Sequence, residues 1–213
     1  MSDVFCREGI EWGNTWFEKA NRADMKRFAM LGDSVTRGIR GRLNELCMQN
    51  EIAVDLCASS SQVTDSMSEK QIRFFFEVSE YKYQSVILQW GGQHGFFRRC
   101  SDDEEYRKIF KSGYENLVRV ISEYCSNIYF LSATPTVLKE DLITPDEKRN
   151  IEIAERNRIV EEVCREYSGK YIDIYSGLTE KSVVHTDYIH FDRAANEGIA
   201  QLIYESIVRI GSI

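Results

Sequence analysis

One serine of this chain is placed as a nucleophile would need to be. Ser34 directly follows the apolar segment RFAML, residues 27–31, and opens a stretch in which apolar residues recur at helical spacing. A serine at a helix start lies beside unpaired backbone N–H groups and the positive end of the helix dipole, which together stabilise a developing oxyanion. Serine is also a preferred N-cap residue, so a purely structural cap is the alternative for Ser34 alone.

A serine hydroxyl needs a base, and the base is usually held by a third group. The chain has three histidines, and two of them lie in HTDYIHFD, residues 185–192. Asp187 precedes His190 by three residues, so a single turn can bring its carboxylate to one imidazole nitrogen and leave the other nitrogen for Ser34. The sequence therefore predicts a Ser34–His190–Asp187 triad.

The same segment also offers a possible metal site. His185, Asp187, His190 and Asp192 supply nitrogen and oxygen atoms of the kind that bind metal ions. Ligands so close in sequence are difficult to arrange around one ion without help from elsewhere in the chain. We therefore expect neither a metal nor any other cofactor.

Short apolar segments alternate with longer stretches of helical periodicity. The segments that we expect to be strands are residues 27–31, 52–57, 85–90, 127–133 and 170–175. This alternation predicts right-handed crossovers and therefore an α/β fold, a three-layer sandwich with a five-stranded, mainly parallel sheet. Such sheets bind ligands at the carboxyl ends of their strands, and both Ser34 and the 185–192 segment follow strands.

We expect residues 1–213 to form a single domain, since the sequence contains no repeat and no linker. Residues 1–26 precede the first strand. Trp12, Trp16 and Ala20 share helical spacing there, which predicts a segment that packs an aromatic face onto the body.

Composition and charge argue against several classes of protein. The 27 basic residues are interspersed with 34 acidic ones, giving a net charge of -7, which is unsuited to a nucleic-acid partner. The N-terminus lacks a secretory signal and no apolar run is long enough to span a membrane, so we expect a cytoplasmic protein.

Six scattered cysteines without a Cys-x-x-Cys pair indicate reduced core thiols. The sequence indicates no particular oligomeric state.

Two motifs together resemble the SGNH/GDSL hydrolase superfamily. Its members carry a Gly-Asp-Ser block near the N-terminus and an Asp-x-x-His block near the C-terminus, which stand here as GDS at 32–34 and DYIH at 187–190. The resemblance runs from about residue 12 to the final helix. It implies a flavodoxin-like three-layer sandwich, the SGNH hydrolase fold, with Ser34, Asp187 and His190 as the catalytic triad.

The resemblance also implies an oxyanion hole, and here the sequence departs from the family pattern. Members add to the N–H at the nucleophile, here Ser34, a glycine N–H after the second strand and an asparagine side chain after the third. The second strand is followed by ASSSQVTD, without glycine, so Ser60 or Ser61 would have to offer the N–H. After the third strand, WGGQHGFF places Gln93 at the asparagine position, whereas relatives with Gly-x-His-Gly give this role to His94, which we favour.

A triad of this kind implies a serine esterase or acylhydrolase that works through an acyl-enzyme. The chain has no room for a large lid domain, so we expect a small-molecule ester substrate with a short acyl group, such as acetyl on a carbohydrate. Gly92 and Phe96 are expected to line the substrate site, while Arg98 and Arg99 precede an acidic run and favour surface ion pairs. An acyltransferase with the same triad and a catalytically impaired binding module are the alternatives.

Overall fold

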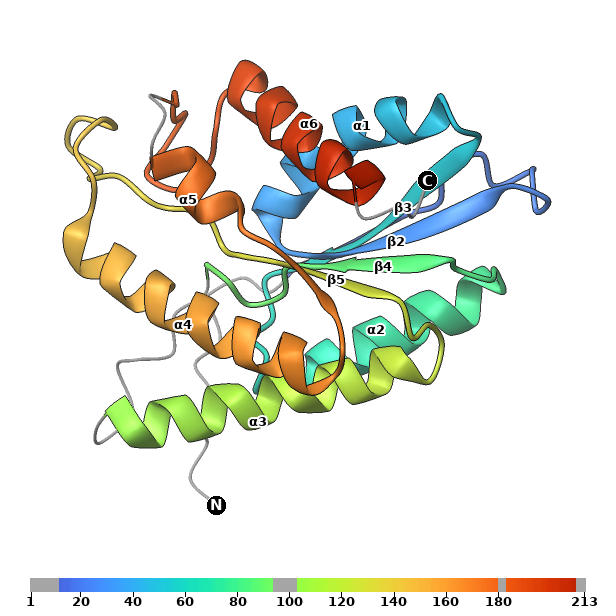
Figure 1. The fold of residues 1–213 in the computed structure, drawn as a ribbon, viewed down its shortest axis with the longest axis horizontal. Coiled ribbons are helices and arrows are strands. Elements are labelled where there is room, and N and C mark those ends of the chain that lie inside the picture. Colours follow the sequence, from blue (N-terminus) through green and yellow to red (C-terminus); the bar gives the residue numbers. More distant parts are fainter. Residues whose placement is uncertain (1–11, 94–102, 180–182, 210–213) are drawn as a thin grey trace.

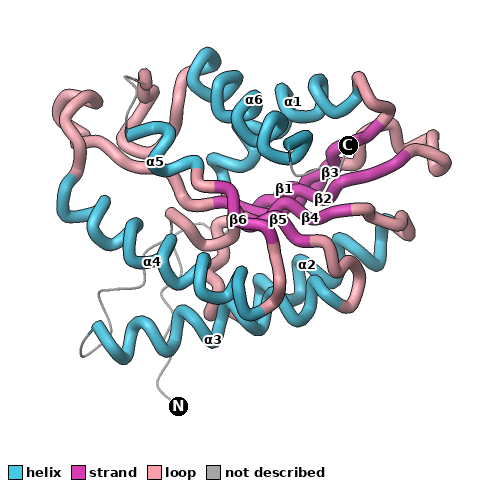
Figure 2. The backbone as a smooth tube through the Cα atoms, in the orientation of Figure 1, coloured by secondary structure: helices cyan, strands magenta, loops and turns pink. Residues whose placement is uncertain are grey.

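The apolar segments form the strands of one central sheet. The computed structural model describes residues 12–93, 103–179 and 183–209. Its six-stranded sheet has the order β1-β3-β2-β4-β5-β6; Figure 1 labels β2 to β5, and Figure 2 labels every strand. The strands are β1 (Gly13–Trp16), β2 (Lys26–Gly32), β3 (Ile52–Ser59), β4 (Ser85–Leu88), β5 (Ile128–Leu131) and β6 (Lys170–Ile172). Strands β2 to β6 pair in parallel, and β1 is antiparallel to β3.

Helices cover both faces of this sheet (Figure 2). They are α1 (Ser34–Met48), α2 (Ser66–Ser79), α3 (Asp103–Ser122), α4 (Glu147–Glu166), α5 (Ile174–Thr179) and α6 (Arg193–Arg209). Successive residues of β2 point to opposite faces: Phe28 and Met30 pack with α1, α5 and α6, whereas Ala29 and Leu31 pack with α2, α3 and α4. The predicted three-layer α/β class is confirmed.

The N-terminal segment forms the sixth strand and not the helical face suggested by its aromatic spacing. Strand β1 pairs with β3 from Gly13 opposite Ser59 to Trp16 opposite Leu56, and the Trp16 side chain is 55% exposed. The outer edge of β3 would otherwise present a row of unpaired backbone groups. Satisfying that edge outweighs the helical spacing of Trp12, Trp16 and Ala20, so residues 13–16 are not helical. Trp12 still packs against the hydrophobic core, whereas Trp16 does not.

The fifth predicted strand is shorter than its apolar pattern suggested. Strand β6 ends at Ile172, and α5 begins at Ile174. The Asp173 carboxylate accepts a hydrogen bond from the Ser176 N–H at 3.0 Å and another from the Ser176 hydroxyl. Aspartate stabilises a helix start in this way, which ends the strand early.

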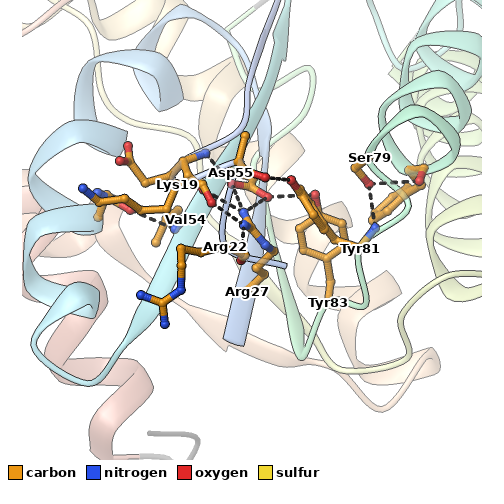
Figure 3. A network of polar contacts seen from close by, with 12 residues as sticks. Lys19, Arg22, Arg27, Val54, Asp55, Ser79, Tyr81 and Tyr83 are labelled. Carbon is orange, nitrogen blue, oxygen red and sulfur yellow. Dashed lines mark hydrogen bonds and ion pairs between the residues drawn. The ribbon is translucent and has the colours of Figure 1, made fainter. Parts of the chain in front are cut away.

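A buried ionic network fixes the connection between β1 and β2 (Figure 3). The Arg27 guanidinium donates to both Asp55 carboxylate oxygens at 3.0 Å, and both side chains are almost completely buried. Arg27 also donates to the carbonyls of Glu18, Lys19 and Arg22. These bonds hold the segment before β2 onto the sheet, near the amino end of that strand.

The described cysteines are buried, free thiols: Cys47, Cys57, Cys125 and Cys164. Burial raises the pKa of the Cys57 thiol to about 12, so this thiol is protonated at neutral pH and is a poor nucleophile. Cys6 and Cys100 lie outside the described residues. Within the ranges described, no helix is both long and apolar enough to cross a bilayer.

Candidate active site

Ser34 lies in the turn between β2 and α1, and its neighbour Asp33 caps the helix. The Asp33 carboxylate accepts the Val35 N–H at 2.9 Å, and the Thr36 hydroxyl accepts the Asp33 N–H at 3.4 Å. A Cβ added at Gly32 would lie 2.1 Å from the Thr36 hydroxyl oxygen, so this cap geometry requires glycine. Because Asp33 is the N-cap, the Ser34 hydroxyl is free for a contact outside the helix.

A chain of buried hydrogen bonds joins this turn to the carboxyl ends of the neighbouring strands. The Thr36 hydroxyl donates to the Gln89 side-chain oxygen at 2.9 Å, and the Gln89 amide donates to the Ser132 carbonyl at 2.8 Å. The Ser132 hydroxyl accepts the N–H groups of Ile174 and Tyr175 after β6. Loops that follow β2, β4, β5 and β6 are thereby held in register around Ser34.

His190, the predicted base, lies in a short hairpin between α5 and α6. His185 forms an antiparallel bridge with Phe191, and the Thr186 N–H donates to the His190 carbonyl at 2.8 Å. At the tip, one oxygen of the Asp187 carboxylate accepts the N–H groups of both Ile189 and His190 at 2.8 Å. The hairpin therefore fixes Asp187 relative to the imidazole that follows it.

The structure brings the three predicted triad residues together. The Ser34 hydroxyl oxygen is 2.6 Å from His190 Nε2, and His190 Nδ1 is 2.7 Å from the second oxygen of Asp187. An ionised carboxylate only accepts hydrogen bonds, so Nδ1 carries the proton and Nε2 accepts from the serine. Burial would raise the pKa of Asp187, but the N–H and imidazole donors outweigh it and lower that pKa. Asp187 thus stays ionised beside the imidazole.

The neighbouring His185 and Asp192 do not join these residues in a metal site. The Asp192 carboxylate accepts the Ala195 N–H in the first turn of α6 at 2.8 Å. The His185 ring lies 4.5 Å from the Phe191 ring, and its burial lowers its pKa. Among the described residues, no group of three His, Cys, Asp or Glu side chains is arranged to hold an ion.

The predicted oxyanion donors differ in whether their N–H groups are already bonded. The Ser60 N–H donates to the Trp12 carbonyl at 3.2 Å, and the Ser61 N–H donates to the Ser59 hydroxyl at 3.0 Å. No described residue accepts a hydrogen bond from the Ser34 N–H. The structure therefore gives no support to Ser60 or Ser61 as donors and leaves the Ser34 N–H available.

Gln93 is also engaged within the protein. Its side-chain amide nitrogen donates to both the carbonyl and the hydroxyl of Thr134, at 2.8 and 2.9 Å. Gly92 packs against the loop after β5, where a Cβ would lie 2.6 Å from the Ala133 side chain. The visible roles of Gln93 and Gly92 are thus structural, while His94 and Phe96 lie outside the described residues.

One cluster beside the Asp187–His190 turn had no signal in the sequence. The Tyr188 ring, within the Asp187–His190 turn, lies 4.2 Å from the Lys139 ammonium and 5.3 Å from the Arg149 guanidinium carbon. Tyr188 is part of the DYIH motif, but Lys139 and Arg149 come from the loop after β5 and from α4. Only the aromatic residue could have been suspected from its place in the motif.

An apolar groove of about 290 Å³ lies between α5, α6 and the start of the His190 hairpin. It reaches Asp192, but none of the three triad residues lines it. Its lining residues are Gly177, Leu178, Val183, Val184, Asp192, Ala194, Ala195, Gly198, Ile199 and Leu202.

Comparison with known proteins gives structural but not sequence matches. No protein-family model and no curated protein match the sequence. The chain is similar to a lipase/acylhydrolase from Enterococcus faecalis, with a TM-score of 0.64 and 16% identity over 86% of this chain and 95% of the other. It is also similar to an acetylxylan esterase from Geobacillus stearothermophilus, with a TM-score of 0.63 and 14% identity over 85% and 94% of the two chains. A likeness at this identity establishes the fold, and the predicted SGNH hydrolase fold is confirmed.

Proposed function

We propose that the protein is a serine esterase that hydrolyses a short acyl ester. The observation that carries this proposal is the continuous hydrogen-bonded chain from the Ser34 hydroxyl through His190 to the Asp187 carboxylate, with distances of 2.6 and 2.7 Å. A hydroxyl bonded to a neutral imidazole that is held by a carboxylate has the arrangement of an activated nucleophile.

Each residue of the chain has one role in this mechanism. The Ser34 oxygen attacks the ester carbonyl as His190 Nε2 takes its proton, and Asp187 stabilises the imidazolium that forms. His190 then returns the proton to the leaving alcohol, leaving an acyl-serine. A water molecule, activated by His190 in turn, hydrolyses this intermediate and restores the Ser34 hydroxyl.

The oxyanion of the tetrahedral intermediate needs donors that are not otherwise engaged. The Ser34 N–H meets this requirement at the start of α1, where the helix dipole adds a partial positive charge. The second donor in this proposal is His94, because the amide of Gln93 is bonded to Thr134.

We further propose that the acyl group is acetyl and that its alcohol is a carbohydrate. Several of the similar solved structures are described as acetylxylan esterases, which supports this substrate class without assigning it. No large lid domain is expected for the chain, which favours a small acyl group. If octanoyl esters were hydrolysed faster than acetyl esters, this choice would be wrong, and the apolar groove beside Asp192 would become the candidate acyl site.

The decisive experiment compares the protein with Ser34→Ala on p-nitrophenyl esters of graded chain length and on acetylated xylooligosaccharides. We expect acetyl to be the preferred acyl group and Ser34→Ala to lower kcat by at least about 10³-fold. Ser206→Ala is the matched control, because its hydroxyl bonds only the Leu202 carbonyl within α6. Ser34→Ala activity equal to that of the control would refute the proposal.

The same proteins and p-nitrophenyl esters also test the two alternative functions, a non-catalytic binding module and an acyltransferase. A burst of p-nitrophenol that requires Ser34 excludes a non-catalytic binding module, because the burst reports formation of the acyl-enzyme. Product analysis with added sugar alcohols then distinguishes hydrolysis from transfer, since an acyltransferase would yield a new ester in place of free acid.

A further inference from the structure

The cluster beside the triad contains two cations around one aromatic ring. Tyr188 belongs to the turn that carries Asp187 and His190, and its ring lies within 4.2 Å of the Lys139 ammonium and 5.3 Å of the Arg149 guanidinium carbon. Both distances are in the range of cation–π contacts. Positive charge is thus gathered beside the turn that carries Asp187 and His190, in a protein whose net charge is -7.

Arg149 is held between two of the segments that form the site. Its guanidinium donates to the Gln93 carbonyl after β4 at 2.8 Å, and its backbone N–H donates to the Asp146 carboxylate at 3.1 Å. Its guanidinium carbon lies 5.3 Å from the centre of the Tyr188 ring. The side chain therefore spans from the turn after β4 to the triad turn, in a fixed position.

Arg149 also lacks the counter-charge that comparable arginines of this protein have. Of the described arginines whose side chains are at least partly buried, the others each have a carboxylate within 4 Å: Arg27, Arg40, Arg42, Arg73, Arg107 and Arg156. The Arg149 guanidinium has none within that distance among the described residues: Asp146 bonds the Arg149 backbone N–H instead, and burial outweighs the more distant charges of Asp146 and Glu152 and lowers the Arg149 pKa. The Arg149 guanidinium is partly buried and donates to one neutral acceptor, the Gln93 carbonyl. Its other N–H groups can therefore donate to an anion.

Lys139 is carried by a loop with its own internal bonds. The Val137 N–H donates to the Tyr188 carbonyl at 3.1 Å, and the Leu138 N–H donates to the Thr144 carbonyl at 2.7 Å. The Asp146 N–H donates to the Thr136 carbonyl at 3.1 Å. Lys139 has no ion pair with any described residue and is exposed, so its charge is available above the ring.

We propose that Arg149, assisted by Lys139 and oriented by Tyr188, binds an anionic group of the ester substrate. The group is a carboxylate or a phosphate, which a guanidinium recognises through paired hydrogen bonds. This assignment rests on the proposed esterase function and narrows its substrate to esters that carry a negative charge. The charge lies either on the acyl part or on the alcohol, and the experiment below distinguishes the two.

The test uses two pairs of esters whose members differ only in charge. In the first pair, p-nitrophenyl hydrogen glutarate is compared with p-nitrophenyl methyl glutarate, so the charge is on the acyl part. In the second pair, 4-acetoxybenzoate is compared with its methyl ester, so the charge is on the leaving group. The ratio of kcat/KM for anionic over neutral member is measured for the wild-type protein and for Arg149→Gln, and comparing the ratios cancels intrinsic reactivity.

We expect Arg149→Gln to lower this ratio about tenfold or more in one pair, as loss of a hydrogen bond to a charged group does. Hydrolysis of the neutral members should fall much less than that of the anionic members, and an unchanged circular-dichroism spectrum reports separately that the variant is folded. Lys148→Gln is the matched control, because it removes the same charge one residue away on an exposed side chain and should leave the ratio unchanged. Lys139→Gln should lower the ratio about threefold, since an exposed charge contributes less.

Three results would overturn the assignment. An unchanged ratio in both Arg149→Gln and Lys139→Gln shows that no anion is bound there, and the esterase proposal then survives if the neutral members still require Ser34. An equal loss on anionic and neutral members shows that Arg149 only positions the Gln93 turn. Absence of any Ser34-dependent hydrolysis of the neutral members refutes the esterase function and this assignment with it.

Discussion

At the scale of single residues, the adjacent Asp33 and Ser34 of the Gly-Asp-Ser motif have different roles. Asp33 accepts the Val35 N–H and caps α1, whereas Ser34 contacts His190 across 156 positions of sequence. A serine that capped its own helix would have its hydroxyl oriented toward the backbone of the first turn. The aspartate is therefore what leaves the serine hydroxyl directed at the imidazole.

Asp187 and His190 lead to a prediction about pH. The lowered pKa of Asp187 means that its carboxylate stays ionised in mildly acidic solution, so protonation of the imidazole is the single step that would disable the base. Protonated His190 cannot accept the serine proton. On a plot of log(kcat/KM) against pH between 8 and 5, the value should therefore fall on acidification with a slope of 1, as expected when uptake of one proton inactivates the enzyme.

The same pair predicts the effect of removing the carboxylate. Asp187→Asn should lower kcat by about 10³ to 10⁴-fold, since an amide no longer holds the required tautomer. Asp24→Asn is the control, because Asp24 pairs with Arg22 on the surface and does not contact the triad. A flat profile, a slope of two protons, or equal activity in the two variants would contradict the assigned roles.

At the scale of elements, the start of α1 is bonded to the ends of other strands. Thr36 closes the capping box with Asp33 and also donates to Gln89, which in turn reaches Ser132 after β5. Hydrogen bonds of this kind are buried, so an unpaired member would bear its full desolvation cost. The position of Ser34 therefore depends on three strands and not on β2 alone.

This arrangement predicts different effects for two substitutions at Thr36. Thr36→Val should lower the free energy of unfolding by about 1 to 3 kcal/mol, because the Gln89 oxygen and the Asp33 N–H lose their partner. Thr36→Ser retains the hydroxyl and should lose less than about 1 kcal/mol. Urea unfolding measures both, and equal stability of the two variants would show that the hydroxyl has no part in fixing the turn.

At the scale of the whole molecule, stability and chemistry are located in different parts. The Arg27–Asp55 pair is buried near the amino end of β2 (Figure 3), whereas Ser34 and His190 lie beyond the carboxyl ends of the strands. Tyr83 donates to Asp55 at 3.0 Å, so the network joins β2, β3 and the segment before β4. It stabilises the sheet without contacting the triad.

A substitution in this network should thus affect folding more than catalysis. Asp55→Asn leaves the Arg27 charge buried without a counter-ion and should lower the free energy of unfolding by about 3 to 5 kcal/mol. Arg193→Gln, which breaks the exposed pair with Glu197, should change it by less than about 0.5 kcal/mol. Under conditions in which both are folded, kcat should match the wild type. A loss of kcat without loss of stability would contradict this separation.

The sequence by itself determined which segments form the parallel strands and the three-layer class, and it predicted the three residues whose side chains meet at 2.6 and 2.7 Å. These depend on local patterns: apolar runs bury themselves, helical spacing covers them, and parallel strands place their carboxyl ends at one edge. Ser34, Asp187 and His190 each follow such a segment, so their meeting could be predicted from order alone.

Only the tertiary structure decided which polar groups of the loops are already bonded. The Ser60 N–H donates to the Trp12 carbonyl, and the Gln93 side-chain amide donates to the Thr134 carbonyl. The Arg149 guanidinium lies over the Tyr188 ring, which belongs to another segment. The edge strand β1 also formed against its own aromatic spacing, because the open edge of β3 was present to pair with it. The physical reason is that hydrogen bonds between loops are set by which groups meet in space, and no periodicity in the chain records those meetings.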